Sequence, residues 1–220
     1  MEERYVKRFS ASERLAHWLH FLAFTVLLGT GGFLYMPALQ PFTVGTAGEA
    51  ARLAHRVAAV VFIACPLIYL IGDPKGFFYS LREAFSWGAE DVQWLRLAWC
   101  YYTRGAKCAG IPPQGKYNAG QKLNVLTQIV AFILFTVTGL IMWFGHGVVS
   151  PALFRWAVII HDLSVTAVLV LFLLHLYLVA IHPFTRESIM AMFEGVVTRE
   201  YAQEHHARWY EEMKAGGEAG

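Results

Sequence analysis

Four long apolar stretches restrict the fold of this chain more than any other feature of its sequence. A helix needs about 20 apolar residues to cross roughly 30 Å of hydrocarbon, and each stretch meets that length. Only 15% of the 220 residues are charged, which is too few for an ordinary water-soluble domain. We therefore predict an all-α membrane protein, a bundle of four transmembrane helices with spans at about residues 15–36, 53–72, 123–144 and 152–181.

The positions of the basic residues predict how these spans are oriented. Fifteen of the 18 Lys and Arg residues precede the first span, lie between the second and third spans, or follow the fourth. Because cytoplasmic segments carry such an excess, both termini and the loop 73–122 are expected in the cytoplasm. The net charge is only +2 and the basic residues are scattered, so we expect no binding to nucleic acid.

The remaining segments divide the chain into a membrane domain, residues 1–183, and a cytoplasmic tail, residues 184–220. The aromatic segment 77–102 is expected to form interfacial helix, and the Gly- and Pro-rich segment 105–120 an ordered or semi-ordered loop. Cys65, Cys100 and Cys108 form neither a CxxC pair nor a CxxCH haem-attachment site. With Cys65 in a span and the other two on the cytoplasmic side, we expect no disulfide and no c-type haem.

Histidines inside the spans indicate the chemistry. His17, His55, His161 and His175 lie where a polar ring is costly unless it has a partner. His161 and His175 are fourteen residues apart, or about 3.9 turns, so both rings leave nearly the same helix face about 21 Å apart along the axis. Neutral imidazoles are strong axial ligands of haem iron. The pattern therefore predicts two b-type haems, stacked across the bilayer.

Depth in the membrane predicts which histidines pair. His55 and His161 lie near the outer side and would hold an outer haem, and His17 and His175 would hold an inner haem. His20 lies three residues after His17 and remains an alternative ligand. For each of the four, a hydrogen bond to a carbonyl or a hydroxyl on another helix is the simpler alternative. The other four histidines are expected to be solvated or interfacial: His146, His182, His205 and His206.

Three arginines lie within a turn or two of the predicted ligands, namely Arg14, Arg56 and Arg155. The guanidinium group has a fixed fork of donors that suits a haem propionate. Snorkelling of the side chain to the membrane interface explains their positions equally well.

Several motifs together resemble a known family. They are Arg14–Leu19 at the first span, Ala54–Arg56 at the second, Lys116–Lys122 before the third, and His161-Asp162 with His175 on the fourth. From about Arg8 to Pro183 the chain resembles the gamma, or cytochrome b556, subunit of respiratory formate dehydrogenases, within the wider family of di-haem membrane cytochromes b. The Lys116–Lys122 run is the most specific of these motifs.

The resemblance implies an electron-transfer subunit of the bacterial inner membrane. Electrons would enter from an iron–sulfur (beta) subunit on the outer face, itself bound to a molybdenum- or tungsten-containing catalytic (alpha) subunit. They would pass through two haem b groups to menaquinone or ubiquinone on the cytoplasmic side. The chain itself would carry no residue catalytic towards formate, and assembly into a higher oligomer of the complex is left open.

The resemblance also implies a quinone site at Asn118, Gly120 and His175. An amide side chain and a flexible backbone can supply hydrogen-bond donors to quinone carbonyls. The alternative for Asn118 is a capping role at the start of the third span.

Two other functions fit the histidine pattern. The chain could serve another oxidoreductase, such as a hydrogenase or a thiosulfate reductase. It could also be a metal or proton transporter that uses the histidines, although such a pathway usually needs carboxylates in the spans, and only Asp162 qualifies.

Overall fold

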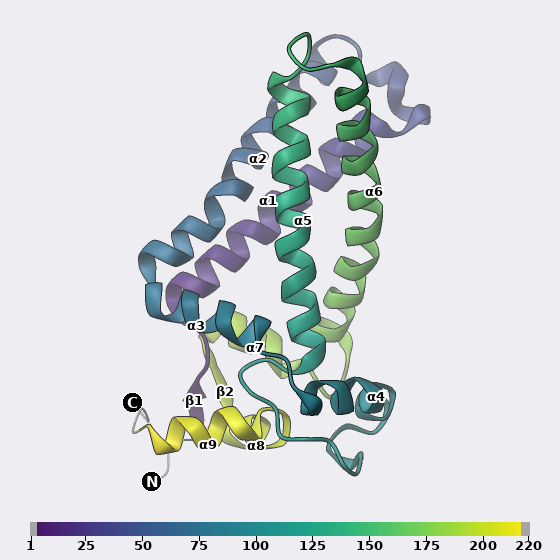
Figure 1. The fold of residues 1–220 in the computed structure, drawn as a ribbon. Coiled ribbons are helices and arrows are strands. Elements are labelled where there is room, and N and C mark those ends of the chain that lie inside the picture. The colour runs from purple at the N-terminus through teal and green to yellow at the C-terminus, as the bar shows by residue number, and fades with distance from the viewer. Residues whose placement is uncertain (1–3, 217–220) are drawn as a thin grey trace. The chain divides into compact units, whose positions relative to one another are not determined.

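The computed structural model describes residues 4–216, so the first three and last four residues of the predicted domains lie outside it. The chain forms two compact units, each described by itself (Figure 1). The first, here called the cap unit, contains residues 4–11, 75–131 and 166–216 of the described chain. The second, here called the helical unit, contains residues 12–74 and 132–165.

Four long helices correspond to the predicted spans: α1 (Ala11–Tyr35), α2 (Gly45–Gly72), α5 (Ala119–Phe144) and α6 (Pro151–Leu176), the last extended by a π-helical turn (Tyr177–Ile181). All four are long and apolar enough to cross a membrane, which confirms the predicted fold class. The first three begin before the predicted apolar stretches, because polar first turns continue the helix. A 3-10 segment (Pro37–Phe42) lies between α1 and α2.

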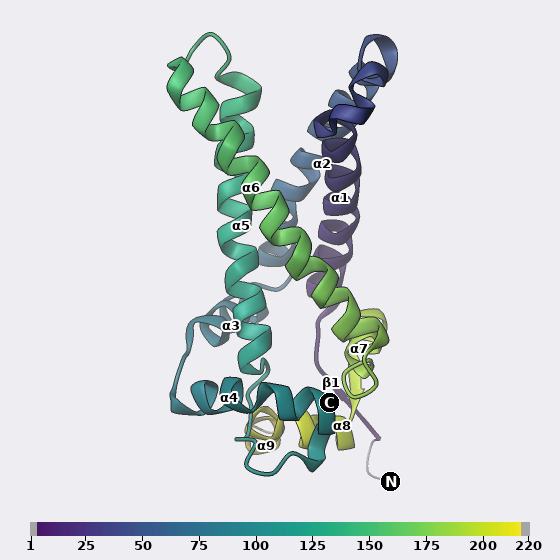
Figure 2. The ribbon, with the colours of Figure 1, turned by 90° about the vertical axis from the view of Figure 1, so that its right-hand side faces the viewer.

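Aromatic side chains join helices within the helical unit, whose segments are visible from two sides in Figures 1 and 2. Phe62 of α2 stacks on Phe132 of α5 with ring centroids 5.6 Å apart. Near the other end of the same pair of helices, the guanidinium of Arg56 lies over the Trp143 ring, 5.6 Å from its centroid. These contacts pack α2 against α5.

The cap unit contains the segments that the sequence left least defined. The predicted interfacial segment forms two helices, α3 (Pro74–Phe85) and α4 (Ala89–Arg104), followed by a 3-10 turn (Gly105–Lys107) and an irregular stretch up to α5. The tail forms α7 (Glu187–Glu194), β2 (Val196–Thr198), α8 (Arg199–His205) and α9 (Ala207–Ala215). Strand β1 (Tyr5–Lys7) pairs antiparallel with β2, which the sequence did not predict.

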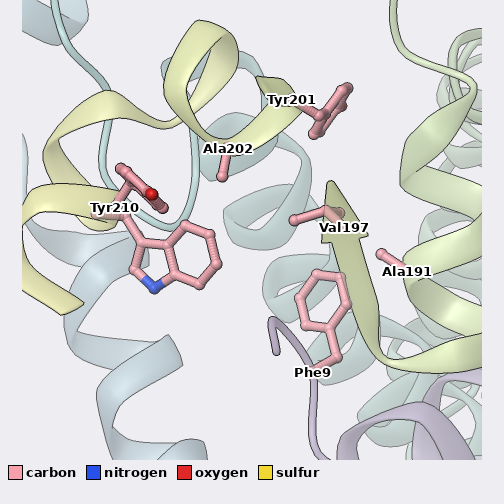
Figure 3. Close-up of a cluster of buried hydrophobic side chains, with 7 residues drawn as sticks. Phe9, Ala191, Val197, Tyr201, Ala202 and Tyr210 are labelled. Atoms are coloured by element: carbon pink, nitrogen blue, oxygen red, sulfur yellow. The ribbon is translucent and has the colours of Figure 1, made fainter. Parts of the chain in front are cut away.

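A hydrophobic cluster ties the two chain ends together in the cap unit (Figure 3). Phe9, just after β1, packs with Val197 of β2 and with side chains of α7, α8 and α9. Its other members are Ala191, Tyr201, Ala202, Trp209 and Tyr210. The described part of the predicted tail is therefore folded onto the N-terminal segment.

Three side-chain hydrogen bonds determine where α5 begins. Asn118 Oδ1 accepts the Gln121 N–H at 2.9 Å, and Gln121 Oε1 accepts the Asn118 N–H at 3.0 Å, which is a reciprocal capping box. Gln114 Oε1 accepts the Ala119 N–H at 3.1 Å. The first N–H groups of a helix have no partner within it, so these bonds stabilise the helix start.

The expectation that no disulfide forms is wrong. Cys100 and Cys108 are bonded, with their Cα atoms 5.7 Å apart, a separation suited to a disulfide. The end of α4 and the 3-10 turn after it bring the two residues together, a local geometry that their spacing in the sequence did not reveal. Cys65 is a free, buried thiol.

A buried ion pair connects α4 to the first turn of α5. The Lys122 side chain is 1% exposed, its Nζ lies 2.9 Å from Asp91 Oδ1, and it donates to the Ser86 carbonyl at 2.7 Å. Asp91 Oδ2 also accepts the Gly88 N–H at the start of α4. The carboxylate therefore both neutralises a buried ammonium group and caps a helix.

We expect Asp91→Asn to destabilise the cap unit by about 3 to 5 kcal/mol, because it keeps the capping acceptor but leaves the ammonium buried without its counter-charge. The measurement is the free energy of unfolding in detergent, from denaturant titration followed by tryptophan fluorescence. Glu211→Gln is the matched control, since Glu211 pairs with Lys214 at the surface and should contribute less than about 1 kcal/mol. Equal free energies of unfolding of the two variants would contradict a stabilising role for the buried Asp91–Lys122 ion pair.

Candidate functional site

The two predicted outer ligands lie in the helical unit, and each is bonded to a threonine of a neighbouring helix. His55 of α2 has its Nδ1 2.9 Å from Thr30 Oγ1 of α1. His161 of α6 has its Nδ1 2.8 Å from Thr138 Oγ1 of α5. The simpler alternative for these histidines, a bond to a hydroxyl on another helix, is therefore present in the structure.

These bonds determine which ring nitrogen carries the proton. The Thr30 hydroxyl donates its proton to the Val26 carbonyl at 2.7 Å, and the Thr138 hydroxyl donates to the Leu134 carbonyl at 2.5 Å. A carbonyl oxygen can only accept, so each threonine oxygen must accept from the histidine Nδ1–H. In a neutral imidazole the other nitrogen, Nε2, then holds a free lone pair. The threonine bonds therefore do not conflict with the predicted ligand role, because they leave Nε2 of each ring available.

Glycines next to both threonines let the helix backbone approach the rings. A Cβ atom on Gly31 would lie 3.4 Å from His55 Cε1, and one on Gly139 would lie 3.8 Å from His161 Cε1. The same Thr-Gly dipeptide thus lies beside each ring. The pairing of His55 with His161 around one haem stays a prediction.

The inner ligands are divided between the two units. His17 of α1 is half-buried in the helical unit beside Trp18, with ring centroids 5.4 Å apart. His20 packs on Phe62, with centroids 4.3 Å apart, which gives it a packing role. His175 lies in the last turn of α6 and belongs to the cap unit. The pairing of His17 with His175 stays a prediction.

Of the three arginines, Arg56 has a defined aromatic contact, the Trp143 ring described above. Arg155 is exposed near the start of α6, and Arg14 is half-buried in the first turn of α1. Their roles towards a propionate or the membrane interface stay predictions.

The predicted quinone residues have structural roles as well. Asn118 is buried and caps α5, which is the alternative considered for it. A Cβ atom on Gly120 would lie 3.1 Å from the Trp94 ring, so a side chain there would disturb a fully buried tryptophan. A quinone role must therefore be tested with substitutions that preserve the cap.

The three histidines expected at solvated or interfacial positions, His182, His205 and His206, are buried instead. Burial and the charge of Arg8 lower the pKa of His205 to about 4, and the same causes lower the pKa of His206 well below its usual value. Both rings are therefore neutral at pH 7. The nearby run of Trp209 and Tyr210 was the sequence signal for a buried tail.

The folded tail also holds the loop that leads into α5. The Gln114 carbonyl accepts the backbone N–H groups of Arg208 and Trp209, at 3.0 and 3.3 Å. The Gly115 carbonyl accepts His206 Nδ1–H at 2.9 Å. Sequence reasoning assigned no role to these tail residues.

Comparison with known proteins identifies the family. The sequence model of the prokaryotic cytochrome b561 family matches residues 8–195, most of the chain. The chain belongs to the prokaryotic cytochrome b561 family. Membership implies a b-type haem, and the paired imidazoles with free Nε2 lone pairs fit that group.

Three relatives of this cytochrome b561 have a more specific name. The formate dehydrogenase cytochrome b556(fdo) subunit of Escherichia coli strain K12 is 26% identical over 213 residues, 95% of this chain and 93% of the relative. The formate dehydrogenase cytochrome b556 subunit of Haemophilus influenzae is 29% identical over 208 residues, 90% of this chain and 79% of the relative. The nitrate-inducible formate dehydrogenase cytochrome b556(Fdn) subunit of E. coli K12 is 26% identical over 208 residues, 92% of this chain and 88% of the relative.

We expect Thr138→Val to weaken haem retention at the outer site about 10- to 100-fold, because His161 loses the acceptor that fixes its tautomer. Thr138→Ser keeps the hydroxyl and should bind haem as the wild type does. The measurement is the haem content per chain during titration with a haem-free haem-binding protein that competes for the haem. Thr25→Val is the matched control, since Thr25 Oγ1 is exposed and donates to the Phe21 carbonyl of its own helix. Equal retention by the Thr138→Val and Thr25→Val variants would reject the positioning role.

Proposed function

We propose that this cytochrome b561 is the membrane subunit of a respiratory formate dehydrogenase, which passes electrons through two b haems to a quinone. The observation that carries the proposal is the pair His55 and His161, each with Nδ1–H bonded to a threonine and Nε2 free to ligate. The names of the relatives, which match at least 90% of this chain, supply the partner enzyme.

The two pairs of histidines have distinct positions in this proposal. His55 and His161 hold the outer haem through Nε2, and Thr30 and Thr138 accept from Nδ1–H and so orient both rings. His17 and His175 hold the inner haem. Fourteen helical residues separate His175 from His161, about 21 Å along the α6 axis, which leaves room for a second haem. When bound, each haem supplies a one-electron carrier.

The quinone site lies in the cap unit, where the first turn of α5 and the last turn of α6 carry its residues. Both turns belong to the cap unit, and residues 145–150 join the two helices. Asn118 Oδ1 is occupied by the Gln121 N–H, so its NH₂ group is the part free to donate to a quinone carbonyl. His175 and the Gly120 backbone complete the site.

The distribution of basic residues supports cytoplasmic termini and a cytoplasmic quinone site in the bacterial inner membrane. Electrons then enter on the outer face from an iron–sulfur subunit that serves a molybdenum- or tungsten-containing subunit. The same histidine plan would serve a hydrogenase or a thiosulfate reductase, and purification of the native complex with its metal content distinguishes these partners. Membership in a cytochrome family favours haem over metal or proton transport.

A dithionite-reduced minus oxidised spectrum tests the ligands directly. We expect two b haems per wild-type chain and one in each of His55→Ala, His161→Ala, His17→Ala and His175→Ala, because a haem with one axial ligand is not retained as a low-spin centre. The double variant of His55 and His161 should lose no more haem than either single variant. His146→Ala, near the end of α5, is the control and should keep both haems. One haem in the wild type would contradict the scheme, and a colourless protein that binds zinc would favour the transporter.

Asn118→Ser separates quinone binding from helix capping. Serine caps helices as well as asparagine does, so the free energy of unfolding should stay within about 0.5 kcal/mol of the wild type. The lost amide donor should weaken quinone binding by about 1 kcal/mol or more, roughly fivefold in affinity. Quenching of the cap tryptophans by 2,3-dimethyl-1,4-naphthoquinone, a short menaquinone analogue, measures the affinity. Unchanged affinity would remove Asn118 from the site.

A further inference from the structure

A cleft of about 450 Å³ opens on the surface of the cap unit beside the loop that leads into α5. Its walls come from the end of α4, from the segment between the 3-10 turn and Gln114, and from α8. Tyr101 and His205 both line it. The cleft is therefore lined in part by a phenol and an imidazole that are almost fully buried.

These two side chains form a close pair. The Tyr101 hydroxyl lies 2.5 Å from His205 Nδ1, and only 3% of the tyrosine and 7% of the histidine are exposed. Burial raises the pKa of Tyr101 well above its usual value, and burial and Arg8 lower the pKa of His205 to about 4. Both groups are therefore neutral at rest.

The pair continues inwards to the proposed quinone site. Tyr101 packs in one buried cluster with Ala119, the residue after Asn118, and the Asn118 amide lowers the pKa of the phenol. Asn118 is itself 4% exposed. Tyr101 therefore lies between the imidazole at the cleft and the amide assigned to the quinone carbonyl. All three residues belong to the cap unit, so this connection lies within one compact unit.

We propose that Tyr101 and His205 carry protons from the cleft to the quinone oxygen that faces Asn118. This inference rests on the proposed function, because it assigns the proton source of that same site. Reduction of a quinone to a quinol consumes two electrons and two protons. The electrons come through the haem chain, and the relay supplies the proton for this one oxygen.

The transfer balances with groups on the chain and water. The Tyr101 O–H bond breaks as the quinol O–H bond forms. His205 Nε2 takes a proton from cleft water, and its Nδ1–H bond breaks as the Tyr101 O–H bond forms again. Water is left as hydroxide, which is neutralised by exchange with bulk solvent. The imidazole is left neutral with its proton on Nε2, and a flip of the ring brings an N–H back to Tyr101 for the next transfer. Tyr101 is the proton donor to the substrate, and His205 reloads it.

A purely structural role for the pair makes different predictions. A buried tyrosine–histidine bond could simply join α4 to α8, and its loss would then alter stability but not the proton step. Tyr102 provides a matched control, because it is the adjacent tyrosine on α4, is partly buried, and packs on Trp94 and His182. Removal of its hydroxyl makes the same chemical change away from the pair.

The experiment uses the full haem-loaded chain in lipid nanodiscs, reduced with dithionite and mixed with excess 2,3-dimethyl-1,4-naphthoquinone. Stopped-flow absorbance follows haem reoxidation in H₂O and in D₂O. We expect Tyr101→Phe to lower the maximal rate about 10²- to 10⁴-fold, the usual contribution of a positioned acid, with quinone affinity and haem spectrum unchanged. Tyr102→Phe should keep the wild-type rate.

Chemical rescue tests the second residue. His205→Ala should slow reoxidation similarly, and added imidazole should restore the rate, because the cleft admits a molecule of that size to the vacated position. A Tyr101→Phe variant at the wild-type rate would overturn the relay while leaving the quinone site intact. A His205→Ala variant that imidazole does not rescue would also overturn it, in favour of a structural pair. Wild-type haem that quinone does not reoxidise would reject the proposed function itself.

Discussion

Inside a membrane span, every polar atom must find a partner within the protein, and this constraint governs the histidines of the helical unit. An imidazole has two nitrogens to satisfy. In His55 and His161 one nitrogen is satisfied by a threonine whose own proton is already donated to a backbone carbonyl. The other nitrogen is left with a lone pair, which an apolar surrounding would make costly unless a metal takes it. Hydrogen-bond accounting therefore supports the proposed ligation by these two histidines, and family membership implies the b-type haem.

The spans and the candidate ligands could be predicted because both depend on the local sequence. A span needs a sufficient length of apolar residues, and a histidine within it stands out because a polar ring is costly in hydrocarbon. It could not identify Thr30 and Thr138. A threonine in a helix commonly bonds the carbonyl four residues earlier, and Thr25 does so as well. What separates Thr30 from Thr25 is the helix that packs beside it, and that neighbour is set by tertiary structure. The repeated Thr-Gly dipeptide was the available signal.

The cap unit was hard to predict for a related reason. Its core packs Phe9 against side chains of β2, α7, α8 and α9. These elements follow Phe9 in the chain by almost two hundred positions. Each tail helix is too short to give a clear helical period of apolar residues. The sequence therefore did not indicate a folded tail or buried histidines. The burial of His205 and His206 depends on the same long-range folding. Helix starts were missed as well, because Asn118, Gln121 and Gln114 continue α5 beyond its apolar stretch.

The two units differ in the way that the proposed quinone reduction requires. Electron carriers work best in an apolar setting with fixed neutral ligands, whereas reduction of the quinone also needs protons from water. The cap unit provides a cleft, an imidazole, a phenol and an amide in that order. Because burial keeps the pKa of His205 near 4, the ring would pass a proton without holding a charge at neutral pH. The relay therefore depends on the tail fold that buries this histidine, which explains why an electron-transfer subunit keeps so much structure outside its spans.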